Sequence, residues 1–250
     1  MTRFRGFRGH HAARYREAYA RHQRRCTASL TLYFAEAVIH RKKTMLSKSH
    51  PIMPTYSYFD LFADALTRWP SMGMNRAPVV SIEQPSTKQV QQAYAFVHDQ
   101  YHLWRTSIPG YLGNQCMEVT TRLYGLLNSR DIKADIVIGS VSTEQYRFFN
   151  CDVPYLRELA KELVDETVPI DLHAWITLGG DSVIDFTLPS KLARNHGAPQ
   201  NLMNEGFCAD ATGMAKHMGL YYEPMLVGSQ YLALVNSADP HEILLRLIGR

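Results

Sequence analysis

Hydrophobic residues recur along this chain at two spacings, and the change from one to the other predicts helices followed by strands. Apolar side chains fall at every third or fourth position over residues 58–69, which places them on one face of a helix. The same spacing returns over residues 87–103, with Ser86 or Thr87 as the helix cap, and again over residues 116–129. We therefore predict three amphipathic helices before residue 130.

Strand-like patterns dominate from residue 134 onward. Residues 134–141 are rich in Ile and Val, as in a buried strand, and residues 171–178 and 182–188 alternate on either side of a glycine pair. The prediction is completed by a surface helix over residues 154–166, a helix over 210–218, a strand over 231–235 and a helix from Pro240. Helices followed by a short antiparallel sheet favour an α+β fold over alternating strand and helix units.

The composition narrows the class of protein. With 250 residues, 46% hydrophobic and 20% charged, the chain resembles ordinary globular proteins. No apolar run approaches the roughly 20 residues that span a bilayer, and no signal peptide opens the chain. The four cysteines form neither a CxxC pair nor a disulfide framework, so we expect reduced thiols in a cytoplasmic protein without a membrane partner.

Positive charge is concentrated at the start of the chain. Residues 1–44 carry eleven Lys or Arg against two Glu, a net charge of +9, which leaves −5 on residues 45–250 out of the overall +4. Arginine mixed with aromatic residues suits an RNA-binding arm, whereas the ordinary composition that starts at Met45 favours an upstream extension; a transit peptide is a third interpretation. We predict a basic, disordered extension at residues 1–44 and one domain at residues 45–250, with its core at about 86–236 and no nucleic-acid partner beyond the arm.

Three residues, Cys116, His173 and Asp185, form a pattern typical of thiol enzymes. Cys116 starts a predicted helix, with Asn114 as a competent N-cap, and the free N–H groups of a helix start favour a thiolate. The same groups can hold an oxyanion, with Gln115 as a side-chain contributor. His173 would act as base and then as acid, and Asp185 would fix its tautomer and orientation.

The loop between the two alternating strands decides whether the imidazole and the carboxylate meet. A two-residue Gly179-Gly180 turn sends the Asp185 side chain to the wrong face of the sheet. A three-residue loop that also includes Asp181 sets Asp185 opposite Trp175 and diagonal to His173 on the same face. The catalytic interpretation therefore predicts the three-residue loop.

Each of these residues also has an ordinary structural interpretation. A cysteine on a helix is most often an inert core residue, and a strand histidine beside Trp175 is more often packed than catalytic. The order of the three residues and the elements that carry them favour catalysis. Cys208 and His217 are nine residues apart, which suits no common zinc spacing, and no phosphate-binding glycine loop is present, so we expect no metal and no cofactor.

Several segments together resemble the core of the transglutaminase-like superfamily of papain-like cysteine enzymes. They are Gly113-Asn114-Gln115-Cys116, the run from Ile132 to Gly139, His173-Ala174-Trp175 and Val183-Ile184-Asp185-Phe186-Thr187, within roughly residues 100–190. The resemblance implies a nucleophile helix packed on a short antiparallel sheet. It also implies Cys116 as nucleophile, His173 as base and Asp185 as orienting group, with Gln115 and Trp175 near the oxyanion or substrate. Arylamine acetyltransferases share the trio, but Trp175 and the lack of an extended acyl-carrier motif favour the first family.

The resemblance implies a cysteine-dependent amide hydrolase or acyltransferase of protease, deamidase or transglutaminase type. Such an enzyme forms a thioacyl intermediate on a peptide or protein substrate and needs no metal. The superfamily also contains inactive relatives, so a peptide- or protein-binding module is the alternative. The link over residues 142–170 is long for a connection between core strands, and we expect it to shape or cover the substrate cleft. The oligomeric state is left open by the sequence.

Overall fold

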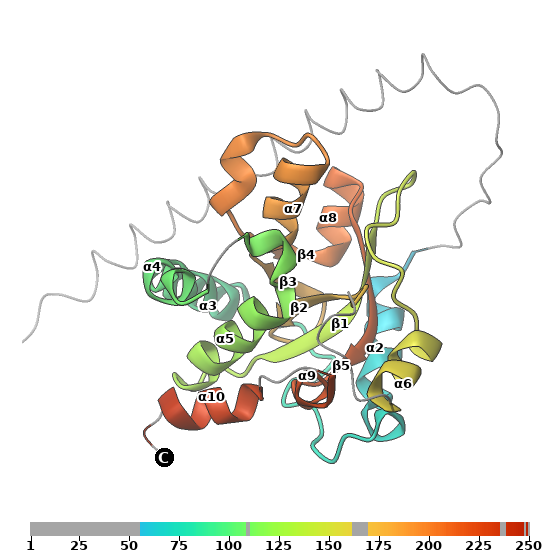
Figure 1. The fold of residues 1–250 in the computed structure, drawn as a ribbon, viewed down its shortest axis with the longest axis vertical. Coiled ribbons are helices and arrows are strands. Elements are labelled where there is room, and N and C mark those ends of the chain that lie inside the picture. The colour runs from blue at the N-terminus through green and yellow to red at the C-terminus, as the bar shows by residue number, and fades with distance from the viewer. Residues whose placement is uncertain (1–55, 109–110, 162–169, 236–238, 248, 250) are drawn as a thin grey trace, which may run out of the picture.

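The structure is a computed structural model that describes residues 56–108, 111–161, 170–235, 239–247 and 249. The predicted extension at residues 1–44 and the end of the predicted surface helix after residue 161 lie outside the described residues. The described part combines one sheet with helices on both of its faces (Figure 1). None of the helices in this part is long and apolar enough to cross a membrane.

Five antiparallel strands form the sheet, in the order β4-β3-β2-β1-β5. The central strand, β2, begins at His173, and its neighbour β3 ends at Asp185. The mixed, antiparallel architecture confirms the α+β class predicted from the order of the elements. The strands are β1 (Asp135–Ser142), β2 (His173–Thr177), β3 (Ser182–Asp185), β4 (Phe207–Asp210) and β5 (Tyr221–Val227).

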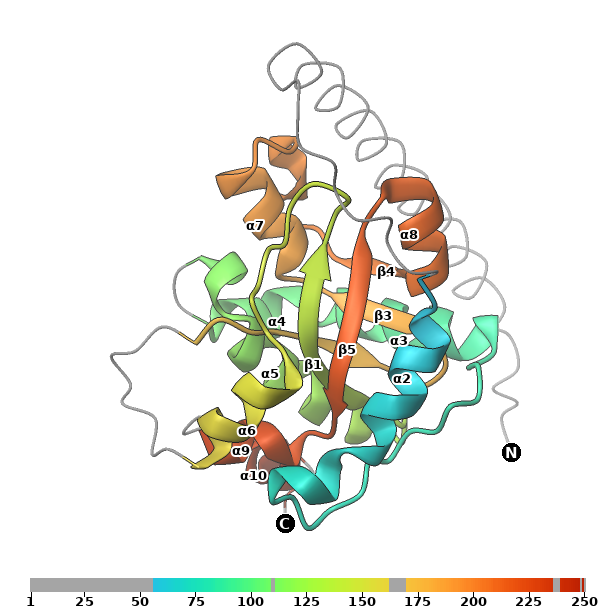
Figure 2. The ribbon, with the colours of Figure 1, turned by 90° about the vertical axis from the view of Figure 1, so that its right-hand side faces the viewer.

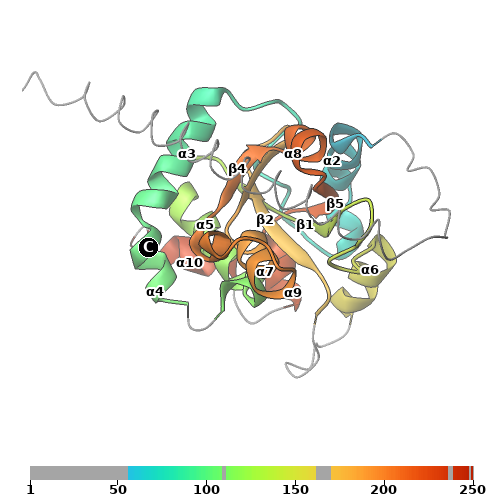
Figure 3. The same cartoon turned by 90° about the horizontal axis from the view of Figure 1, so that it is seen from above.

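The helices form a layer on each side of the sheet, as the view from above shows (Figure 3). On one side lie α3 (Thr87–Asp99), α4 (Tyr101–Thr106), α5 (Cys116–Asn128), α9 (Gln230–Val235) and α10 (Pro240–Leu247). On the other side lie α2 (Tyr58–Thr67), α7 (Leu188–Asn195) and α8 (Ala211–Met218). α6 (Val153–Lys161) packs beside α9, and short 3-10 helices cover Trp69–Met72, Leu112–Asn114 and Gln200–Asn204. Figure 2 shows α2 running along the edge strand β5.

Alternate strand residues fill two separate cores, one on each face of the sheet. Ala174 and Ile176 of β2 belong to the core under α5, whereas Trp175 belongs to the core under α2, α7 and α8. Because successive side chains of a strand point to opposite faces, His173 shares the face of Trp175. Because both faces of the sheet are covered, every residue of β1, β2 and β3 is buried.

Most of the predicted helices are confirmed, with changes at their ends. Ser86 caps α3 and forms a reciprocal capping box with Gln89, and Asp210 caps α8. The helix predicted over residues 87–103 is divided at Gln100 into α3 and α4. α7 and β4 were not predicted from the sequence.

The strand predicted over residues 231–235 is wrong, because these residues belong to α9. The strand in this region is β5, which the sequence analysis missed. Pro224 lies inside β5 and argues against a strand, since proline cannot donate to the hydrogen-bond ladder. β5 is an edge strand, where proline is tolerated, so the position of the strand in the sheet overrides the local signal.

A bulge on β5 is fixed by a contact from outside the sheet. The register between β1 and β5 shifts after Ile138, and Met225 is the additional residue on β5. The carbonyl oxygen of Met225 accepts a hydrogen bond of 2.9 Å from Arg68 at the end of α2. The bulge therefore ties the edge of the sheet to the α2 layer.

Replacing Gly139 with Ala is expected to destabilise the fold by about 3 kcal/mol, the upper range for an overpacked core. A Cβ atom at this position would overlap the backbone oxygen of Glu223 and lie 3.0 Å from the Trp175 ring. Urea unfolding followed by circular dichroism would measure the loss. Gly197→Ala is the control, because no atom lies within 4 Å of a Cβ there and only its φ of 74° carries strain. Equal losses in the two variants would contradict the steric argument.

Candidate active site

Cys116 is the first residue of α5, the helix that packs against the central strand. Asn114 belongs to the preceding 3-10 helix, so the N-cap is Gln115 and not Asn114 as predicted. The Gln115 side chain makes no capping hydrogen bond, so it does not occupy the N–H groups of the first turn. Cys116 is 9% exposed, and its thiol donates to the Leu172 carbonyl oxygen at 3.7 Å.

His173 and Asp185 meet through the three-residue loop that the catalytic interpretation predicted. β2 and β3 pair with Ile176 opposite Ile184, a register that leaves three residues in the loop and sets Asp185 opposite Trp175. The Nε2 atom of His173 lies 2.6 Å from Oδ2 of Asp185, and each side chain is only 1% exposed. The prediction for the loop is confirmed.

The Asp185 carboxylate has hydrogen-bond donors on both oxygens. Oδ2, which bonds His173, also accepts from the Tyr222 hydroxyl at 3.0 Å. Oδ1 accepts from the Thr187 N–H at 2.8 Å, the Thr187 hydroxyl at 3.0 Å and the Leu188 N–H at 3.1 Å. Since α7 begins at Leu188, the same carboxylate anchors the start of that helix.

Opposite charges hold this buried pair in its ionised form. Burial lowers the pKa of the His173 imidazole, but the charge and hydrogen bond of Asp185, with a contribution from the Cys116 thiol, raise the pKa to about 9. Burial raises the pKa of Asp185, but the His173 charge and the hydrogen bonds to the carboxylate outweigh it and lower the pKa below its usual value. The imidazolium and the carboxylate therefore coexist around neutral pH.

The second ring nitrogen of His173 is the open position of the site. Nδ1 is buried and has no hydrogen-bond partner among the described residues. The Cys116 thiol is near enough to contribute to the raised pKa of the imidazole, although it donates its hydrogen bond to Leu172. Because Nε2 is bonded to Asp185, Nδ1 is the nitrogen left for the sulfur. The structure thus brings together the three residues that the sequence singled out.

Two aromatic rings, one from the loop after β1 and one from β2, pack against the imidazole. The Phe149 ring stacks on it with centroids 4.6 Å apart and planes 14° apart, and Trp175 follows at 5.9 Å and 29°. Trp175 is 0% exposed and donates its indole N–H to Tyr58 at 3.4 Å, so in this structure it supports the imidazole and offers no surface to a substrate. Gln115 is partly exposed beside the thiol, and its oxyanion role stays a prediction.

Tyr222 and Phe149 belong to the site but were not predicted from the sequence. Tyr222 lies on β5, whose strand pattern is interrupted by Pro224, so its face could not be assigned. Phe149 lies in the long link over residues 142–170, for which a role in shaping the cleft was expected. A pair of adjacent phenylalanines, Phe148-Phe149, in a polar loop was the available signal.

The other described cysteines lack these surroundings. Cys151 is fully buried, and burial raises the pKa of its thiol to about 12. Cys208 is buried on β4 with 3% exposure, and both thiols are free of disulfides, as is Cys116. Within the described ranges, no group of three or more His, Cys, Asp or Glu side chains is placed to hold a metal ion.

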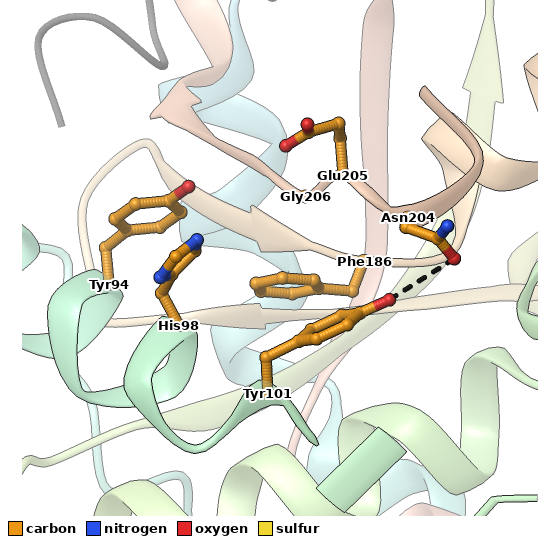
Figure 4. Close-up of a pocket in the computed structure, with 7 residues that line it drawn as sticks. All are labelled: Tyr94, His98, Tyr101, Phe186, Asn204, Glu205 and Gly206. Atoms are coloured by element: carbon orange, nitrogen blue, oxygen red, sulfur yellow. Dashed lines mark hydrogen bonds between the residues drawn. The ribbon is translucent and has the colours of Figure 1, made fainter. Parts of the chain in front are cut away.

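A separate cavity of about 230 Å³ lies between α3, α4 and the segment before β4 (Figure 4). Three aromatic side chains, Tyr94, Tyr101 and Phe186, contribute to its wall, and Tyr101 donates a long hydrogen bond of 3.4 Å to Asn204 across one end. The remaining lining residues are His98, Glu205 and Gly206. None of the three candidate catalytic residues lines this cavity, so it is distinct from the candidate active site.

Comparison of the chain with protein-family models, with curated proteins and with solved structures finds no match.

The stability that His173 adds is expected to depend on pH. A raised pKa means that the contribution is fully present below the unfolded pKa of about 6.5 and is lost as the pH rises towards 9. Asp185 sets the limit at low pH, because its pKa is lowered in the folded protein. The stability that it adds is present above its unfolded pKa and is lost as the pH falls through its folded pKa. The difference in unfolding free energy between the unmodified protein and His173→Gln should therefore be largest between about pH 4 and 6.5 and shrink by pH 9.

Urea unfolding at pH 6, 7.5 and 9 would measure that difference. His98→Gln, which changes an exposed histidine on α3, is the matched control. A difference for His173→Gln that stays constant from pH 6 to 9 would rule out the ion pair.

Proposed function

We propose that this chain is a cysteine-dependent amide hydrolase or acyltransferase that acts on a peptide or protein through a thioacyl-enzyme intermediate. The observation that carries the proposal is the orientation of His173. Its Nε2 is bonded to a buried carboxylate, and its unpartnered Nδ1 is the nitrogen open to a thiol at the start of a helix. A helix-borne cysteine beside a histidine and an aspartate on adjacent antiparallel strands also supports a transglutaminase-like core.

In the first half-reaction, the thiol proton is already held on Nδ1 of the His173 imidazolium, and the Cys116 sulfur attacks the substrate carbonyl carbon. The carbonyl oxygen becomes an oxyanion, which the N–H groups of the first turn of α5 can stabilise, with Gln115 as a further donor. The imidazolium then returns the proton to the amide nitrogen, the C–N bond breaks, and an amine leaves. The product is a thioester between Cys116 and the acyl group.

In the second half-reaction, His173 takes a proton from an acceptor that attacks the thioester carbon. Water as acceptor releases a carboxylic acid, and an amine releases a new amide. In either case the C–S bond breaks and the sulfur regains the proton from the imidazolium. Asp185 stays ionised throughout and keeps the imidazole in one orientation.

The alternative is a catalytically inactive domain of the same kind that binds a peptide or protein partner. The ion pair between His173 and Asp185 weighs against it, because binding alone does not require a buried imidazole aimed at a thiol. In the alternative, Cys116→Ser keeps the biological activity of the protein, whereas in the proposed enzyme that activity is lost.

p-Nitrophenyl acetate is a direct test of the first half-reaction. The Cys116 thiolate should displace p-nitrophenolate in a burst of one equivalent, and mass spectrometry should find the acetyl group on the peptide that contains Cys116. His173→Ala should slow the burst about 100-fold, the lower range for loss of a general base. An added amine that accelerates decay of the acetyl-enzyme would identify an acyltransferase, and decay independent of amine would identify a hydrolase.

Cys151→Ser is the control for the burst, because its buried thiol with a raised pKa should not react. Equal acetylation of Cys116 and Cys208, or a burst unaffected by His173→Ala, would exclude an activated thiol. Asp185→Asn should lower the burst rate while a folded far-UV spectrum is retained.

A further inference from the structure

The helix α7 lies directly against the turn that leads to Cys116. The Tyr111 hydroxyl, just before this turn, donates a hydrogen bond of 2.9 Å to the backbone oxygen of Ser190 on α7. A Cβ atom on Gly113 would lie 2.9 Å from the backbone nitrogen of Lys191. Glycine thus permits a close approach between helix and turn, which brings the Lys191 side chain beside the candidate active site.

The Lys191 ammonium group contacts the same aromatic ring as the catalytic imidazole. Its Nζ atom lies 4.1 Å from the centroid of the Phe149 ring, and that ring stacks on His173. The ring faces of phenylalanine attract cations, so this contact holds the ammonium in a defined place. Lys191 is therefore a fixed positive charge next to the reacting groups.

No carboxylate of the described residues forms an ion pair with Lys191, although its side chain is half-buried. Burial lowers the pKa of the ammonium, while the nearby Cys116 and Asp171 oppose that effect. The Asp171 carboxylate is already engaged by the backbone and side-chain nitrogens of Asn150 at 3.1 and 2.9 Å. A partly desolvated ammonium without its own counter-ion is costly to the protein alone, and an anion that binds beside it removes part of that cost.

A second cation on α7, the exposed Arg194, also contacts an aromatic ring. The guanidinium of Arg194 lies 4.5 Å from the centroid of the Tyr111 ring, and no carboxylate of the described residues pairs with it. Lys191 and Arg194 are three positions apart, so they lie on one side of the helix. Both cations are thus held on aromatic rings around the segment that carries Cys116.

We propose that Lys191, with Arg194 beside it, forms a carboxylate-binding subsite that selects acidic substrates for the thiol of Cys116. The proposal rests on the proposed function, because the subsite is defined by its position next to the nucleophile. The carboxylate belongs either to an Asp or Glu side chain of the substrate or to its C-terminus. Lys191 acts here as a specificity-determining residue, and the proton transfers remain with His173.

Alkylation of Cys116 by iodoacetate and by iodoacetamide tests this subsite without a known substrate. In both reactions the thiolate sulfur forms a bond to the reagent's CH₂ carbon and iodide leaves, and the two reagents differ in the carboxylate of iodoacetate. Rates would be measured by mass spectrometry of the peptide that contains Cys116. The ratio of the iodoacetate rate to the iodoacetamide rate should fall about fivefold in Lys191→Met, the change expected from one charge several Å away near a protein surface.

Two variants of the full chain control for charge and for folding. Lys191→Arg should keep most of the ratio, because it retains the positive charge on the same helix. Lys161→Met removes an equal charge from an exposed, ion-paired position on α6, and it should leave the ratio unchanged. An unchanged ratio in Lys191→Met, or an equal fall in Lys161→Met, would overturn the subsite.

The iodoacetamide rate tests the proposed function, and the ratio of the two rates tests the subsite. If His173→Ala slows that rate and Lys191→Met leaves the ratio unchanged, the enzyme proposal stands and the subsite is rejected. If His173→Ala has no effect on that rate, the activated thiol is rejected whatever the ratio.

Protection experiments distinguish the two sources of the carboxylate. The probes are N-acetyl-Gln-Glu-amide, whose carboxylate is on a side chain, and N-acetyl-Gln-Ala, whose carboxylate is terminal. The probe with the preferred carboxylate should slow iodoacetamide labelling of Cys116 in the unmodified protein but not in Lys191→Met. Equal protection by the neutral N-acetyl-Gln-Ala-amide would contradict carboxylate recognition.

Discussion

A buried carboxylate has to be surrounded by hydrogen-bond donors, and in this protein the requirement of Asp185 organises both the fold and the site. Its partners come from different elements: His173 from β2, Tyr222 from β5, and the backbone of Thr187 and Leu188 from the start of α7. Each partner must be in place for the ionised carboxylate to be tolerated at 1% exposure. The site is therefore a consequence of how these elements pack.

The same carboxylate links the candidate active site to the proposed carboxylate-binding subsite. Because Asp185 fixes the first residues of α7, it also sets where that helix meets the turn before Cys116. Lys191 then falls beside Phe149, and Phe149 lies on the imidazole. One short stretch, from the end of β3 into α7, thus supplies both the orienting group and the positive charge.

The three candidate catalytic residues could be predicted because each has a local signal. Cys116 precedes a clear amphipathic pattern, and the alternation around Gly179-Gly180 fixed which loop length would bring His173 and Asp185 to one face. The rest depends on contacts between distant parts of the chain. Tyr222 lies on β5, where Pro224 interrupts the sequence pattern of a strand. The sequence near Lys191 does not show that the helix α7 packs against Gly113. Pairing and packing override local propensity at these positions.

The choice of ring nitrogen decides what the histidine can do. A carboxylate only accepts hydrogen bonds, so the proton between His173 and Asp185 belongs to Nε2. In the neutral imidazole, Nδ1 is then a lone pair that can take the Cys116 proton. In the imidazolium, which the raised pKa of His173 favours, Nδ1 carries a buried N–H with no partner among the described residues, and such a donor is costly unless an acceptor faces it. The Cys116 sulfur is the candidate acceptor beside Nδ1, so the orientation that Asp185 gives to the imidazole also decides which ring nitrogen faces the thiol.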